Sequence, residues 1–150
     1  MAHKLIKQIE NCTEKYYYNG ELYLIVIRDD FESDNCVFFT PDDYSQQFGY
    51  LSHSKGHIIK AHIHKFVKRE VTYTKEVLFI KKGKIKINIY SEKKDYIDYI
   101  TVFSGDIVML CNGGHEFYML EDSKIIEVKQ GPFAGDAIDK ERFDGIEEKK

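Results

Sequence analysis

The chain has 150 residues and a mass of 17.6 kDa, which is the size of one domain and leaves no room for a second catalytic domain. Hydrophobic residues at 43% and charged residues at 31% exclude intrinsic disorder. The net charge is −3 and only three of the 22 cationic residues are Arg, so we expect no nucleic-acid partner. No apolar run approaches the roughly 20 residues that cross a bilayer, and the N-terminus lacks a signal-peptide pattern. These features predict a cytoplasmic protein with no membrane partner.

Aromatic and β-branched residues are abundant and Pro is rare, which favours strands over helices. Ile85, Ile87 and Ile89 alternate with polar residues, as in a half-buried strand. Strands are predicted, in chain order, at residues 22–28, 36–40, 56–67, 76–81, 84–90, 96–103, 107–110, 115–120 and 125–129. A short helical turn is predicted at 137–143. Short strands separated by Gly or Asp turns are typical of an all-β sandwich or barrel.

The three cysteines, Cys12, Cys36 and Cys111, are far apart in the sequence and form no CxxC pair. This spacing indicates neither a disulfide framework nor a thiolate zinc site. We expect buried free thiols.

Three histidines and one glutamate have the spacing of a metal site. His62 and His64 are two residues apart in a segment expected to be extended, so their side chains share one face. Glu76 begins the next predicted strand, and His115 begins a later one. Imidazole and carboxylate ligands suit one divalent ion, Zn, Mn, Fe, Ni or Co. The alternative is a polar pocket without a metal.

The spacing resembles that of the cupin family. Its first motif is matched by Gly56, five residues, His62-Ile63-His64, and then Glu76, six residues and Gly83, with eleven residues between His64 and Glu76. The second motif is matched by Gly105, five residues, and the stretch from Cys111 to His115. The resemblance implies a single cupin (jelly-roll) barrel at 49–130, with short extension strands at 1–48 and a C-terminal loop and tail at 131–150, all in one domain.

Further phrases are similar to those of small cupins found beside surface-polysaccharide and nucleotide-sugar genes. They are Glu-Val-Leu-Phe-Ile at 76–80, Gly-Gly-His at 113–115 and Lys-Gln-Gly-Pro at 129–132. By this resemblance His62, His64, Glu76 and His115 are the metal ligands. The implied function is a metal-dependent isomerase or epimerase of a carbohydrate or nucleotide-linked sugar.

Other residues are candidates for substrate binding and proton transfer. Lys60 shares the predicted face of His62 and His64 and suits an anionic substrate group, although solvent exposure is the alternative. Three aromatic residues could stack on a sugar or base, or pack in the core: Tyr73, Tyr90 and Phe117. Glu127 lies within an apolar strand and is a candidate acid–base group. With His62 and His64, it completes the predicted catalytic set.

Two other functions fit the same residues. A non-haem iron dioxygenase would use the histidines and leave positions open for O2. A non-enzymic small-molecule sensor would use the barrel mouth without turnover. A homodimer is also predicted, through pairing of strand 22–28 with another subunit's sheet.

Overall fold

The computed structural model describes residues 4–10 and 13–149, which leaves Cys12 outside the described residues. The chain divides into two compact units, and each is described by itself. Unit 1 contains the described residues up to Phe31 together with those from Thr74 onward, and unit 2 is Glu32–Tyr73. The division falls at positions different from the expected boundaries at 48 and 130.

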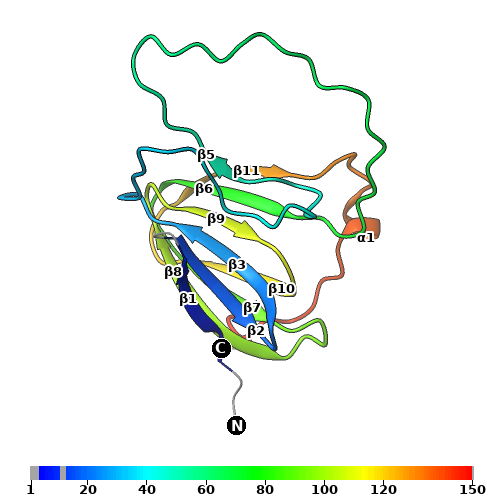
Figure 1. The fold of residues 1–150 in the computed structure, drawn as a ribbon. Helices are drawn as coiled ribbons and strands as arrows, with labels where there is room; N and C mark the ends of the chain where they lie inside the picture. Colours follow the sequence, from blue (N-terminus) through cyan, green and yellow to red (C-terminus); the bar gives the residue numbers. More distant parts are fainter. Residues whose placement is uncertain (1–3, 11–12, 150) are drawn as a thin grey trace. The chain divides into compact units, whose positions relative to one another are not determined.

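The larger sheet of unit 1 has six antiparallel strands (Figure 1). Their order across the sheet is β1 (Ile6–Glu10), β2 (Thr13–Tyr18), β3 (Glu21–Ile27), β9 (Ile107–Leu110), β6 (Glu76–Lys82) and β11 (Lys124–Lys129). The N-terminal strands are therefore part of the main sheet. Since β3 pairs with β2 on one side and β9 on the other, both its edges are occupied. The prediction that this strand pairs with a second subunit is wrong, while the homodimer itself stays a prediction.

The smaller sheet of unit 1 has the order β10 (Gly114–Met119), β7 (Lys84–Tyr90) and β8 (Tyr96–Phe103). One hydrophobic core joins the sheets, because it contains Leu24, Leu78 and Val108 from the larger sheet and Ile87 and Ile100 from the smaller. The all-β prediction is confirmed, in the form of a β-sandwich. The described strands form separate sheets and do not close into the single barrel that the sequence predicts.

Strand β7 separates two environments. Ile85, Ile87 and Ile89 are buried in the core, as their alternation predicts. Lys86 and Asn88 alternate with them and so lie on the other face, where the C-terminal segment, residues 136–147, contacts them through Glu147. This segment begins with the short helix α1 (Asp136–Asp139), close to the predicted helical turn.

Unit 2 contains one small hairpin of β4 (Val37–Phe38) and β5 (Gly49–Tyr50), beside which the Phe39 and Phe48 rings pack with centroids 5.1 Å apart. The strand predicted at 56–67 is wrong, because all of these residues are described and none is in a strand. Ile63 and Phe66 are 90% and 96% exposed. An apolar run indicates a strand only where a neighbouring strand supplies hydrogen bonds, and that neighbour is not visible in a sequence pattern.

Among the described residues, no helix is both long enough and apolar enough to span a membrane.

Candidate functional site

The structure brings two of the predicted metal ligands together in unit 1. Glu76 begins β6 and lies opposite Leu110 of β9, a core residue, so its side chain is on the inner face of the larger sheet. His115 is in β10 opposite Ile89, another core residue, so it is on the inner face of the smaller sheet. His115 Nε2 is 3.3 Å from Glu76 Oε2. The pair thus connects the two sheets of the sandwich.

The environment of Glu76 keeps it ionised. A hydrogen bond from His115 lowers the pKa of Glu76 and outweighs the opposite effect of burial, and the charges of His115, Lys140 and Lys129 lower it further. Glu76 is only 6% exposed, whereas the His115 side chain is 31% exposed. A ligand can therefore reach the pair from the His115 side and meet a carboxylate that is already charged.

Three more side chains lie on the inner faces of the two sheets, two on the larger sheet and one on the smaller. Lys129 lies directly opposite Glu76, and Glu127 lies opposite Leu78, across the pairing of β6 with β11. The Phe117 ring is 5.1 Å from the His115 ring. Glu127 is exposed, because β11 is the edge strand of its sheet. Glu127 therefore lacks the buried position that its apolar strand suggested, but it lies two residues from Lys129 on the same face of the sheet.

Of the remaining predicted residues, His62, His64 and Lys60 lie in unit 2 and are exposed. The His62 and His64 rings are 5.4 Å apart, although the shared strand face on which their pairing was predicted does not exist. His62 Nδ1 is 2.9 Å from the Lys60 carbonyl oxygen. Tyr73, also in unit 2, is 69% exposed. Their roles as ligands, catalytic groups or substrate contacts stay predictions from the sequence.

Tyr90 has a structural role in place of the predicted substrate contact. It is 2% exposed, its hydroxyl donates to Glu116 Oε2 at 2.7 Å, and the Ile146 N–H donates to it at 2.8 Å. Burial raises the pKa of Tyr90 to about 12, even though the Ile146 N–H acts against it. Because the ring packs edge-on against Phe143 of the C-terminal segment, it is not free to stack on a ligand.

Sequence reasoning missed Lys129 and Lys140 as neighbours of Glu76. Lys129 lies opposite Glu76 because of the register of β6 with β11. Lys140 follows α1, and a 2.7 Å hydrogen bond from the Thr74 hydroxyl to Asp139 connects α1 to the residues just before β6. The Lys129-Gln130-Gly131-Pro132 phrase drew attention to Lys129, but a sequence phrase does not show that β11 pairs with β6 so that Lys129 lies opposite Glu76. Within the described part of the chain, no three His, Cys, Asp or Glu side chains already stand in metal-coordinating positions.

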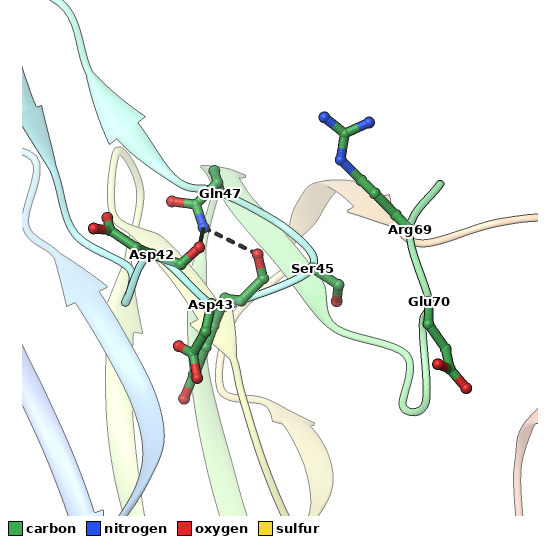
Figure 2. Close-up of a pocket in the computed structure, with 7 residues that line it drawn as sticks. Asp42, Asp43, Ser45, Gln47, Arg69 and Glu70 are labelled. Atoms are coloured by element: carbon green, nitrogen blue, oxygen red, sulfur yellow. Dashed lines mark hydrogen bonds between the residues drawn. The ribbon is translucent and has the colours of Figure 1, made fainter. Parts of the chain in front are cut away.

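A separate pocket in unit 2 is lined by polar residues, among them Asp42, Asp43 and Arg69 (Figure 2). Gln47 organises its turn by donating to the carbonyl oxygens of Pro41 and Tyr44 at 3.0 Å each. Figure 2 shows the acidic side chains and the Arg69 guanidinium pointing in different directions. Because these charges do not converge, we place the candidate site at Glu76 and His115.

Comparison of the chain with family models, curated proteins and solved structures finds no match.

Proposed function

We propose that the protein binds one divalent metal ion through Glu76 and His115 and acts on a small carbohydrate or nucleotide-linked sugar by isomerisation or epimerisation. The observation that carries the proposal is the contact between a buried, ionised carboxylate and a partly exposed imidazole on the facing inner surfaces of a sandwich. The cupin resemblance of the sequence supports the same assignment.

The donor set fits such an ion. Oxygen and nitrogen ligands each lie about 2.0–2.2 Å from a first-row divalent metal, so two ligands of one tetrahedral ion are separated by about 3.3–3.6 Å. The observed 3.3 Å between Glu76 Oε2 and His115 Nε2 is at the lower end of this range. The absence of a thiolate in the pair favours imidazole- and carboxylate-binding metals. Lewis-acid polarisation of a carbonyl or enediol oxygen is the chemistry that such an ion supplies.

The neighbouring residues fit the handling of a polar, anionic substrate. Lys129, opposite Glu76, offers a cation to a phosphate or carboxylate group. Glu127 is exposed on the same face and is placed to accept or return a proton from a substrate carbon. Phe117, beside His115, offers an apolar surface to a sugar ring.

Metal binding is tested by calorimetric titration with Mn²⁺, Fe²⁺, Ni²⁺, Co²⁺ and Zn²⁺. We expect binding to the wild type and a loss of at least about tenfold in affinity for Glu76→Gln and for His115→Gln, since even outer-shell changes cost that much. Glu92→Gln, in an exposed loop, is the matched control. Equal affinity in all four proteins would show that the metal is held elsewhere.

The reaction class is tested by incubating a panel of nucleotide-linked sugars with the protein in D₂O and following carbon-bound deuterium by NMR. Isomerisation and epimerisation by proton transfer both remove a C–H proton, so turnover by this route introduces deuterium. We expect exchange with the wild type and strongly reduced exchange with Glu127→Gln. Metal binding without exchange on any sugar would reject the isomerase assignment and favour a binding module.

A further inference from the structure

A second group of metal-ligating side chains lies in unit 2, outside the site described above. Cys36 Sγ is 3.7 Å from His53 Nε2 and 3.8 Å from the Ser52 carbonyl oxygen. The His53 ring stacks on the His57 ring, with centroids 4.2 Å apart and planes 4° from parallel. All three side chains are exposed, so an ion can reach them from solvent.

Local structure explains why residues so far apart in the sequence meet. The pairing of Val37 with Tyr50 in the β4–β5 hairpin places Cys36 beside the residues that follow β5. A turn then brings His57 back over His53, closed by a 3.1 Å hydrogen bond from the His57 N–H to the Ser54 carbonyl oxygen. Gly56 occupies this turn with φ +86°, a conformation that residues with a Cβ rarely adopt.

We propose that Cys36, His53 and His57 form a zinc site. Thiolate sulfur and imidazole nitrogen are the ligands of protein zinc, at about 2.3 and 2.0 Å. Around a tetrahedral ion these bond lengths separate sulfur from nitrogen by about 3.5 Å. The 3.7 Å between Cys36 Sγ and His53 Nε2 is close to that separation. Three protein ligands leave the fourth position for water.

Binding requires a small movement of the rings. The stacked arrangement does not yet direct both imidazoles at one point, in agreement with the absence of a preformed metal cluster among the described residues. The terminal torsion of His is broad, and exposed side chains change rotamer within nanoseconds. Because His53 and His57 are exposed, they can tilt toward Cys36 without repacking a core.

A bound ion would stabilise the fold of unit 2, which has little hydrophobic core. Its buried residues are Phe39 and Thr40, so hydrophobic burial contributes little to its stability. Small units with little core commonly depend on a metal, whose binding free energy then becomes folding free energy. The zinc site shares no residue with Glu76 and His115, so it stands independently of the proposed function.

The test is a titration of the reduced protein with Co²⁺, which takes the place of Zn²⁺ and gives a near-ultraviolet charge-transfer band only when a thiolate binds it. We expect the band in the wild type and in the control Cys12→Ser, and its loss in Cys36→Ser. Zn²⁺ should displace Co²⁺ and abolish the band. For His53→Ala and His57→Ala we expect Zn²⁺ affinity to fall at least about tenfold.

A band that persists in Cys36→Ser, or no band in the wild type, would reduce the Cys36–His53 contact to a thiol–imidazole hydrogen bond and overturn the zinc site. Alkylation of Cys36 by iodoacetamide, followed by mass spectrometry, gives a second readout, because bound Zn²⁺ should slow it. Unchanged alkylation also overturns the proposal. Glu76→Gln and His115→Gln should keep the band, so failure of the Glu76 site and failure of the Cys36 site are told apart.

Discussion

Arg28 forms ion pairs with two carboxylates of unit 1. Its Nη1 donates to Asp106 Oδ2 at 2.7 Å, and its Nη2 donates to Glu14 Oε2 at 2.9 Å. The Tyr16 hydroxyl also donates to Glu14, at 2.7 Å. Charged groups removed from water stabilise a fold only when they are paired and hydrogen-bonded, as these are. The three charged residues connect β2, β3 and the turn before β9.

Glu14 makes the stability of the fold depend on pH. Burial alone would raise its pKa, but hydrogen bonds from Arg28, Tyr16 and Lys7 lower the pKa of Glu14 to about 2. A carboxyl whose folded pKa is below its unfolded value stabilises the fold above the unfolded pKa, near 4.3, and this contribution is lost as the pH falls toward 2. For Glu14→Gln we expect the free energy of unfolding at pH 7 to fall by about 1–2 kcal/mol, after allowance for solvent screening.

The measurement is urea denaturation of wild type and Glu14→Gln at several pH values between 7 and 3. The difference between the two proteins should shrink as the pH falls. Glu21→Gln, an exposed glutamate at the start of β3, is the control and should follow the wild type. A constant difference at all pH values would show that Glu14 acts through packing and not through its charge.

At single positions, the sequence identified residues that contact one another better than it identified their neighbours and their burial. The spacing analysis selected Glu76 and His115, which lie in contact. It did not identify Lys129, because that lysine reaches Glu76 only through the register of β6 with β11. It placed Tyr90 at the substrate, whereas the C-terminal segment covers its ring, and it expected Cys36 to be buried, whereas Cys36 is exposed. Strand register and the packing of a distant segment over a side chain depend on residues far apart in the sequence, so the spacing of residues in a motif does not show them.

At the scale of elements, local patterns predicted strands well wherever turns delimit them. The strands at 84–90, 96–103 and 107–110 have the bounds expected from alternation and Gly or Asp turns. The strand expected at 36–40 shrinks to Val37–Phe38, and the one at 56–67 does not form. Both failures lie in unit 2, where β4 and β5 are each two residues long and give little support to further pairing. Pairing therefore decides which apolar runs become strands.

The C-terminal segment is an element that the sequence described only as a loop and tail with a short helical turn. Phe143 packs edge-on against Tyr90 with ring centroids 5.1 Å apart, and Glu147 forms an ion pair with Lys86. For Phe143→Ala we expect the free energy of unfolding to fall by about 1–2 kcal/mol, because an aromatic contact and part of an apolar surface are lost. Chemical denaturation measures the change. Phe133→Ala, at a 70% exposed position of the same tail, should change it by less than about 0.5 kcal/mol; equal effects of the two changes would contradict the assigned packing.

For the whole molecule, the division into units is discontinuous in the sequence. Unit 1 is built from both ends of the chain, since β9 pairs with β3 from the N-terminal part and with β6 from the part after unit 2. The sequence predicts a boundary at neither residue 31 nor residue 74. The division follows from strand order, which only the assembled sheets reveal.

This arrangement predicts the course of limited proteolysis. Residues 55–69 are exposed, lie outside helices and strands, and contain four lysines and Arg69. Exposed segments without regular structure are cut first, so trypsin should cleave here before it cleaves at Lys86, within the central strand of the smaller sheet. The N-terminal fragment then carries β1–β5 and the C-terminal fragment carries β6–β11.

The two fragments should stay together in native size-exclusion chromatography and separate only in denaturant. Four residue pairs between β3 and β9, from Leu24–Leu110 to Ile27–Ile107, join strands that belong to different fragments, and the shared core adds apolar contacts between them. Mass spectrometry of the first products identifies the cut. Cleavage that begins in the strands of unit 1, or fragments that separate under native conditions, would contradict a sheet assembled from both ends of the chain.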